Sequence, residues 1–133
     1  MKKEYVVTRK DLLYPEMSFI INGVLFDVFN QIGGGHNEKY YQKAVAIGLQ
    51  NKGLDFVEQY YTPLKFDSEI VGKYYLDFLI GDKIILELKR GRYTPLNVIS
   101  QTKKYLSALD FRLGIIGCFT NDCVIIKRII NQN

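Results

Sequence analysis

The chain has 133 residues, and this length favours one domain with a hydrophobic core of its own. Hydrophobic residues make up 47% of it and charged residues 24%, with a net charge of +4, which is typical of a globular protein. No apolar run approaches the length of a membrane span, and residues 1–16 contain no uninterrupted apolar core or cleavage site. We therefore expect no membrane segment, no signal peptide and a cytoplasmic location.

Two helices are predicted in the first part of the chain. Residues 18–32 place apolar side chains on one stripe, with Ser18 as the N-cap, and the glycines at 33–35 end this helix. The stripe consists of Ile21, Leu25, Val28 and Ile32. A second helix is predicted over residues 37–52, with Gly53 as its C-terminal stop.

Strands dominate the rest of the chain, interrupted by one helix. Thr94 and Pro95 are predicted to be the N-cap and first residue of that helix, which would run to about Ala108. Aromatic, branched and apolar runs predict five strands, at 55–66, 71–80, 83–89, 113–119 and 123–130. This order predicts an α/β fold with a mixed sheet of about five strands and helices on both faces.

Few side chains are available for a soft metal or for a hydrolase triad. Cys118 and Cys123 cannot make a four-ligand zinc site, and Cys118 is expected to be a buried free thiol. His36 is the one histidine, so centres with two or three histidines are excluded, and no nucleophile elbow accompanies it. We expect His36 to be a structural residue beside the glycine turn.

Positive charge is concentrated in one stretch of the chain. Residues 1–86 hold 10 basic and 11 acidic residues, whereas residues 87–112 hold 6 basic and 2 acidic residues. A basic surface beside carboxylates suits a polyanionic partner, and phosphate is the first candidate. The alternative is an ordinary solvated surface of lysine and arginine.

The stretch YYLDFLIGDKIILELKRGRY, residues 74–93, carries charge inside two otherwise apolar strands. Glu87 and Lys89 project from one face of the sheet because side chains alternate along a strand, whereas Leu86 and Leu88 project from the other. Burial of an unpaired charge is costly, so both groups need partners or a metal ion.

The register of this hairpin decides whether Asp77 joins Glu87. A two-residue connection at 81–82 would place Asp77 opposite Leu86, on the wrong face. A three-residue connection at 81–83, or a bulge near Asp77, would place it opposite Glu87. The sequence is compatible with each of these registers.

Convergence of these charges would favour a metal site. Two carboxylates about 4 Å apart repel by roughly 4 kcal/mol, which a lysine offsets in part and a divalent cation offsets far better. Oxygen ligands favour Mg²⁺ or Mn²⁺ over zinc. The alternative is a buried Asp–Lys or Glu–Lys pair without chemistry.

Three further features are unspecific when each is taken alone. Glu38 lies in the first turn of the second helix, where a glutamate can be simply a partner of the helix dipole. Gln101 and Tyr105 lie on one face of the third predicted helix, which a surface glutamine and a half-buried tyrosine also explain. The stretch KRGRY at 89–93 could bind phosphates or form a polar loop.

Taken together, these residues resemble the PD-(D/E)XK nuclease superfamily. Asp77, followed ten residues later by ELK at 87–89, resembles its signature, with Leu76 where proline is usual. GHNEKYY at 35–41 is similar to the motif of the GxxExxY family. The pair Gln101-x-x-x-Tyr105 is similar to a motif of the exonuclease-type branch, and the motifs come in the order of the family.

The resemblance implies a restriction-endonuclease-like α/β/α fold in a single domain, residues 1–133, with its core at about 18–130. It implies hydrolysis of phosphodiester bonds in nucleic acid with Mg²⁺ or Mn²⁺, with DNA favoured over RNA. A homodimer is compatible with so small a nuclease.

The resemblance also implies roles for individual residues. Asp77 and Glu87 would hold the ion with the backbone carbonyl of Leu88, and Glu38 would lie at the same site, where it could hold a second metal ion or its water. Lys89 would orient the attacking water and offset charge on the phosphate. Substrate contacts would come from Arg90, Arg92, Gln101 and Tyr105.

Two other classes of function compete with the nuclease. One is a non-catalytic module of nuclease fold that binds nucleic acid or a protein partner, against which the intact set of acids and lysine argues. The other is an interaction protein, since the chain has ten tyrosines, a residue type that suits interfaces. We expect core packing to account for many of these tyrosines.

Overall fold

The computed structural model describes residues 13–92 and 94–131, so Tyr93 and most of the N-terminal segment considered above lie outside the described residues. Its elements are α1 (Pro15–Ile32), α2 (Glu38–Asn51), β1 (Phe56–Phe66), β2 (Glu69–Ile80), β3 (Ile84–Arg90), α3 (Leu96–Leu109), β4 (Leu113–Phe119) and β5 (Val124–Ile130). This is the predicted order of helices and strands. None of the helices in the described ranges is long and apolar enough to cross a membrane.

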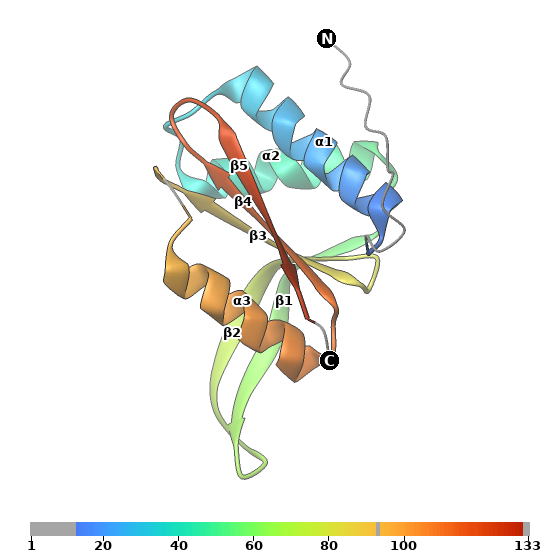
Figure 1. Cartoon of the computed structure of the whole chain (residues 1–133), viewed down its shortest axis with the longest axis vertical. Helices are drawn as coiled ribbons and strands as arrows, with labels where there is room; N and C mark the ends of the chain where they lie inside the picture. The colour runs from blue at the N-terminus through green and yellow to red at the C-terminus, as the bar shows by residue number, and fades with distance from the viewer. Residues whose placement is uncertain (1–12, 93, 132–133) are drawn as a thin grey trace.

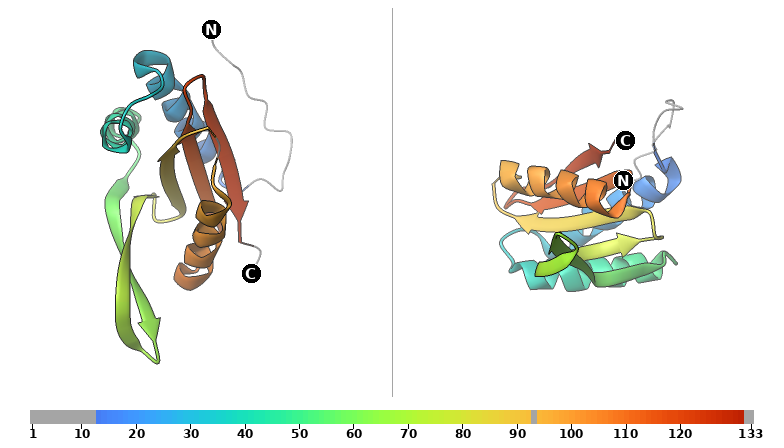
Figure 2. Two further views of the ribbon diagram at one scale, coloured as in Figure 1. Left: turned by 90° about the vertical axis from the view of Figure 1, so that its left-hand side faces the viewer. Right: turned by 90° about the horizontal axis from the view of Figure 1, so that it is seen from below.

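The five strands form one mixed sheet in the order β1-β2-β3-β4-β5. The β3–β4 pair is parallel and the other three pairs are antiparallel. A parallel pair needs a crossover connection, and α3 supplies it. Viewed from below, the molecule has three layers, with α3 above the sheet and α2 beneath it (Figure 2). The predicted fold class is therefore confirmed.

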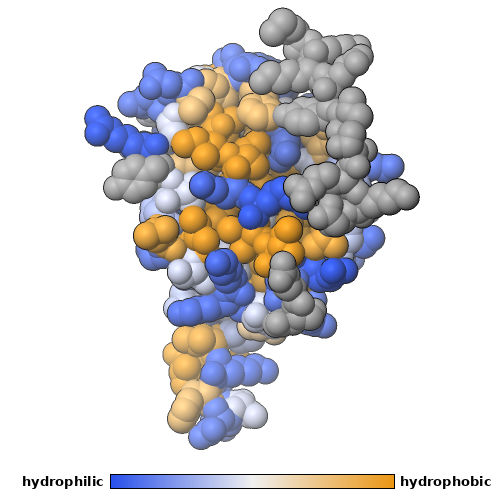
Figure 3. All heavy atoms as spheres, in the orientation of Figure 1, coloured by the Kyte–Doolittle hydropathy of each residue, from blue (hydrophilic) through white to orange (hydrophobic). Residues whose placement is uncertain are grey.

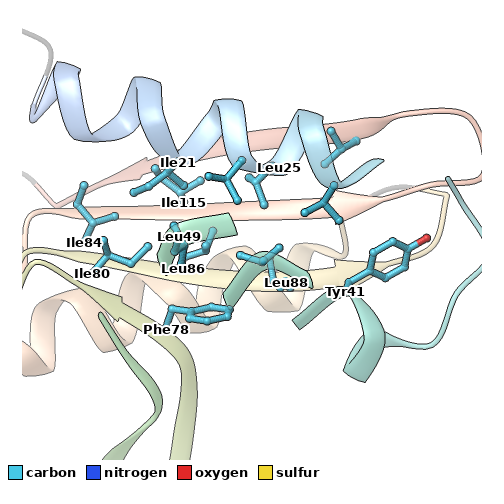
Figure 4. Close-up of a cluster of buried hydrophobic side chains, with 14 of the residues drawn as sticks. Ile21, Leu25, Tyr41, Leu49, Phe78, Ile80, Ile84, Leu86, Leu88 and Ile115 are labelled. Atoms are coloured by element: carbon cyan, nitrogen blue, oxygen red, sulfur yellow. The ribbon is translucent and has the colours of Figure 1, made fainter. Parts of the chain in front are cut away.

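The larger hydrophobic core fills the space between the sheet and the α1/α2 layer, which we call the α1/α2 face (Figure 4). Leu25 of α1, Leu49 of α2 and Ile115 of β4 are each fully buried there. A smaller cluster packs α3 against the opposite side of the sheet, the α3 face, with Ile85 and Leu106 at its centre. Alternate residues of β3 therefore face two different cores, as a central strand requires.

The predicted N-caps of two helices were wrong. Helix α1 begins at Pro15, one turn before Ser18, because proline is pre-organised for a first helical position. Ser18 is buried inside the helix and accepts a hydrogen bond from Arg128 Nη1 at 2.9 Å. Helix α3 begins at Leu96, and its N-cap is Pro95, whose ψ of 141° is still extended.

Strand β2 leaves the sheet part of the way along β3. It pairs with β3 only over Phe78–Ile80, whereas β4 follows β3 over its whole length. We call the point where β2 departs from β3 the fork. Beyond it, residues 60–66 of β1 and 69–75 of β2 continue as a two-stranded arm that projects from the body (Figure 1). Asp67 and Ser68 at the tip both have positive φ, as a tight two-residue hairpin turn needs.

The arm exposes apolar side chains. Hydrophobic residues follow one side of it at the bottom of the space-filling view (Figure 3). The most exposed are Phe66, Ile70 and Val71, of which each side chain is at least 60% accessible. These residues add little to either core.

Candidate active site

The turn between β2 and β3 has the three-residue connection that brings Asp77 and Glu87 together. Ile80 pairs with Ile84, and Phe78 pairs with Leu86. Phe78 and Leu86 both pack on the α1/α2 face, so Asp77 and Glu87 project toward the α3 face. The register that the sequence left open is therefore settled in favour of one shared face.

The two carboxylates lie at the fork, where the backbone pairing of β2 with β3 ends. Their oxygen atoms accept hydrogen bonds from backbone N–H groups there. The backbone N–H of Asp77 donates to Glu87 Oε1 at 3.2 Å. The backbone N–H of Leu88 donates to Asp77 Oδ2 at 2.7 Å. Each acid thus accepts a hydrogen bond from the opposite strand, which holds both side chains in fixed positions.

Strand β2 twists sharply at Asp77. Leu76 and Phe78 are two residues apart, yet they pack into the clusters on opposite faces of the sheet. The register opposite Asp77 also omits Gln59, which has a φ of +50°. This local irregularity lets the strand turn away from β3 and opens the edge of β3 beside the carboxylates.

Burial raises the pKa of both acids. Desolvation is the main cause for Glu87, the charge of Asp77 adds to it, and together they raise the pKa of Glu87 to about 8. Desolvation also raises the pKa of Asp77, against the hydrogen bond from Leu88 and the charge of Lys89, which lower it. The surrounding hydrogen bonds and the charge of Lys89 therefore do not offset the cost of burying these two carboxylates in their ionised forms.

Glu38 pairs with Lys89 at the edge of the site. Their side chains meet at 3.7 Å between Oε1 and Nζ, and both are more than a third exposed. The pairing bridges the start of α2 and the end of β3, which the departure of β2 leaves accessible. Glu38 also contributes to the raised pKa of Asp77 through its charge.

The glycine turn before α2 positions Glu38. A Cβ on Gly34 would lie 2.6 Å from backbone atoms of Asn121 and Thr120, so only glycine fits against this turn. Tyr41 is buried, stacks on Phe119 with ring centroids 4.1 Å apart, and donates to the Gly33 carbonyl at 2.7 Å. The GxxExxY-like stretch thus anchors the loop in this molecule.

His36 is part of the same anchor. Its Nε2 lies 2.6 Å from the carbonyl oxygen of Ile32, and its backbone N–H donates to the Tyr41 hydroxyl. Arg90 Nη1 donates to the His36 carbonyl at 3.0 Å and so ties β3 to this turn. Arg90 and Arg92 border a hollow of about 520 Å³ beside the β4–β5 turn.

Tyr105 of α3 lies near the acid pair, and Gln101, one turn before it, is its hydrogen-bond partner. The charge of Glu87 contributes to the raised pKa of Tyr105, which is about 12 mainly because of burial, and a hydrogen bond with Gln101 lowers it. Tyr105 also contacts Tyr74 of the arm, with ring centroids 5.5 Å apart. Tyr105 is therefore the link between the acid pair and the arm.

The fork fits a divalent cation by the chemistry of its donors. Asp77 and Glu87 offer hard oxygen atoms, and a cation would offset the desolvation that raises the pKa of both acids and the charge of Asp77 that further raises the pKa of Glu87. Within residues 13–92 and 94–131, no three His, Cys, Asp or Glu side chains are grouped for a metal. Glu38 lies with Lys89 and does not complete a three-acid cluster.

The expectation that core packing accounts for many of the tyrosines was wrong for several of them. Tyr41 is a core residue, but Tyr40 of α2 and Tyr61, Tyr74 and Tyr75 of the arm are each more than 40% exposed. Strand alternation could have revealed this, because Tyr74 and Tyr75 are adjacent and cannot face the same side. The projection of the arm, which leaves much of its surface exposed, depends on the fork and has no local sequence pattern.

Cys118 is buried and free, as predicted, and Cys123 is an exposed free thiol. Burial raises the pKa of the Cys118 thiol. Neither cysteine takes part in the fork.

The architecture and the fork define a restriction-endonuclease-like α/β fold. The sequence profile of the PD-(D/E)XK nuclease superfamily matches residues 15–129, and the chain therefore belongs to that superfamily. No curated protein matches the chain. The crystal structure of SSO0001 is similar with a TM-score of 0.47 and 13% identity, over 88% of this chain and 78% of that chain.

Proposed function

We propose that this protein hydrolyses phosphodiester bonds of nucleic acid with the help of a divalent cation, Mg²⁺ or Mn²⁺. The observation that carries the proposal is the pair Asp77 and Glu87. These two carboxylates share the fork, each accepts a backbone hydrogen bond from the opposite strand, and each has a raised pKa. A divalent cation is the natural counter-charge for such a pair.

Asp77 and Glu87 would hold the cation through their side chains, and Leu88 would add its backbone carbonyl. The N–H and C=O of one strand residue project from the same edge. The Leu88 N–H meets Asp77, so the carbonyl of Leu88 also belongs to the open edge of β3. When bound, the cation would lower the pKa of a water molecule and polarise a phosphoryl oxygen.

Lys89 and Glu38 would complete the site from the edge of β3. Lys89 would orient the attacking water and offset the charge that develops on the phosphate. Glu38 Oε1 lies 3.7 Å from Lys89 Nζ, and Glu38 is a candidate further ligand. The motif around Glu38 supports placement within the GxxExxY family.

Four other side chains are proposed to contact substrate. Arg90 and Arg92 would bind the phosphate backbone beside the hollow that they border, a contact that carries no sequence information. Gln101 and Tyr105 would contact the nucleic-acid strand next to the acid pair.

We propose DNA as the substrate in preference to RNA, a cytoplasmic location, and a homodimer as the assembly to test.

A cleavage assay tests this function. The protein is incubated with single- and double-stranded DNA and RNA in Mg²⁺, Mn²⁺ or EDTA. Cleavage should require the metal and fall at least about 100-fold in Asp77→Asn and in Lys89→Met. The matched controls are Asp82→Asn, in the turn of the same hairpin, and Lys127→Met, exposed on β5.

A non-catalytic module of the same fold is the second candidate. It is favoured by the hydrogen bonds at the fork, which give both carboxylates a purely structural use. Binding of nucleic acid that persists in Asp77→Asn and Lys89→Met, without cleavage by any form of the protein, would support the module and contradict the nuclease.

A further inference from the structure

A groove lies between the arm and α3, next to the acid pair. It is a hollow of about 540 Å³, within the range of sites that bind small molecules. The residues on which the argument rests are Thr62, Leu64, Tyr74, Gln101, Lys104 and Tyr105. The groove exists because the arm leaves the sheet at the fork and passes beside α3.

The register of the arm turns one of its faces toward α3. Thr62 and Tyr74 are direct cross-strand partners, so their side chains project from the same face. Gly72, paired with Leu64, has no side chain of its own and leaves room beside it. The opposite face of the arm carries Tyr75, which does not border the groove.

Two residues of the groove, Tyr105 and Tyr74, lie near the carboxylates. Tyr105 borders the groove and is close enough to Glu87 for the charge of that acid to affect it. Along β2, Tyr74 precedes Asp77 by three residues, which is about 10 Å at the rise of a strand. A nucleotide that adjoins a phosphate at the fork would therefore lie in the groove.

The chemistry of the groove suits the flat face and polar edge of a nucleobase. Tyr74 and Tyr105 have their ring centroids 5.5 Å apart at an angle of 56°, and Tyr74 is 41% exposed. An exposed tyrosine offers a ring on which a base can stack. Gln101 can donate to and accept from a base edge, and the Lys104 ammonium suits a phosphate.

Thr62 supplies an independent observation. This residue is only 3% exposed, and its Oγ1 has no hydrogen-bond partner within the described part of the chain. A buried hydroxyl without a partner costs about 1–3 kcal/mol. It borders the groove, where a polar group of a bound ligand could satisfy it.

We propose that this groove binds an unpaired nucleobase of the strand whose phosphate lies at Asp77 and Glu87, so that the substrate is single-stranded at that point. The proposal rests on the proposed function and adds the class of substrate. A base inside a duplex is covered by its stacked neighbours, so it cannot enter the groove without leaving the helix. Stacking does not distinguish DNA from RNA, and both are included in the test.

Binding is measured in EDTA, where no cleavage occurs, by fluorescence anisotropy of labelled oligonucleotides. The oligonucleotides are single-stranded DNA, single-stranded RNA and a DNA duplex of equal length. Tyr74→Ala should weaken single-strand binding about 5- to 150-fold, as expected for one lost stacking contact, and should change duplex binding little. Tyr75→Ala is the matched control, because Tyr75 is 48% exposed on the other face of the arm.

Thr62→Val separates binding from folding. It replaces an unpartnered hydroxyl by a methyl group of the same shape, so the melting temperature should stay the same or rise. Single-strand affinity should nevertheless fall. A fluorescent base analogue such as 2-aminopurine can be placed in the strand. Its fluorescence should be quenched on binding to the unaltered protein and to Tyr75→Ala, and less so on binding to Tyr74→Ala.

The outcomes distinguish this proposal from the nuclease itself. Metal-dependent cleavage together with equal affinities of Tyr74→Ala and Tyr75→Ala for single strands would overturn the groove and leave the nuclease standing. Single-strand binding that depends on Tyr74 and Thr62 without any cleavage would support the groove and contradict the nuclease. Absence of single-strand binding by the unaltered protein would overturn the groove, whatever the cleavage assay gives.

Discussion

The two faces of the sheet are built from the same strands but are used differently. On the α1/α2 face, β3 contributes Leu86 and Leu88 to a continuous apolar core. On the α3 face, the alternate residues Glu87 and Lys89 lie at the fork and its edge. The second half of β3 therefore contributes Leu86 and Leu88 to a core and Glu87 and Lys89 to the candidate site, and substitutions of these two sets should have separable effects.

The largest loss of stability is expected on the α1/α2 face. Leu25→Ala removes a fully buried side chain from the larger core and should lower the free energy of unfolding by about 2–5 kcal/mol. Leu96→Ala is the matched control, because Leu96 is 81% exposed at the start of α3 and should change it by less than about 0.5 kcal/mol. Denaturant unfolding measures the loss in each variant, and similar losses would contradict the role of Leu25 in the larger core.

The glycine turn should show the next largest effect. Gly34→Ala places a Cβ 2.6 Å from the backbone of the β4–β5 turn, and we expect a loss of about 1–3 kcal/mol. Gly23→Ala should have the opposite sign, by up to about 1 kcal/mol, because Gly23 lies within α1 with open space around it. Thermal unfolding of the two variants measures this difference, and two equal shifts would count against the close approach.

The fork should make stability depend on pH. The pKa of Glu87 is about 8 in the folded protein against 4.5 ordinarily, so the folded state retains this proton longer than the unfolded chain. The contribution of Glu87 to the stability of the folded protein is therefore greatest below about pH 4.5 and decreases as the pH rises to about 8, when measured in EDTA. Glu87→Gln should flatten this dependence, whereas Glu58→Gln, exposed on β1, should leave it as it is.

Addition of a divalent cation provides a second test of the fork carboxylates. At pH 8 or above, Mg²⁺ should raise the melting temperature of the unaltered protein, because it binds the ionised carboxylates of the folded state only. Glu87→Gln should lose this response. A pH profile that is the same with and without Glu87 would show that the fork carboxylates do not govern it.

The smallest change of stability is expected for Lys89. Its ion pair with Glu38 is more than a third exposed on both sides, so Lys89→Met should cost less than about 1 kcal/mol. Cleavage should nevertheless be lost, as the proposed function requires. A double-mutant cycle with Glu38→Gln measures the coupling of the pair, and a coupling well above 1 kcal/mol would assign the two residues to structure instead.

Prediction of the fold succeeded where a local pattern repeats. The apolar stripe of α1, the alternation in β3 and the uninterrupted apolar run of β4 each mark an element, because periodicity reflects burial on one or both faces. It failed at the helix starts near Ser18 and Thr94, where a proline nearby moved the first turn. Caps depend on one or two backbone dihedral angles, to which the surrounding pattern contributes little.

The sequence indicated that Asp77 and Glu87 belong to the candidate site, but it did not determine how the residues of the site are arranged. Asp77 and Glu87 do meet, but the sequence allowed a two-residue turn that would have separated them. Glu38 was expected at the same site, and the structure shows that its carboxylate pairs with Lys89 at the edge of that site, which the sequence did not indicate. Thr62 and Tyr74 could not be predicted as neighbours of the site, because nothing near them in sequence indicates a fork.

The amino-acid sequence by itself determined the order of the elements, the fold class and the set of charged side chains in the central hairpin, because each depends on spacing within one short segment. Only the tertiary structure decided the hairpin register, the departure of β2 from β3 and the groove between the arm and α3. These features depend on how segments far apart in the chain compete for the same sheet edge, and such competition leaves no periodic trace in the sequence.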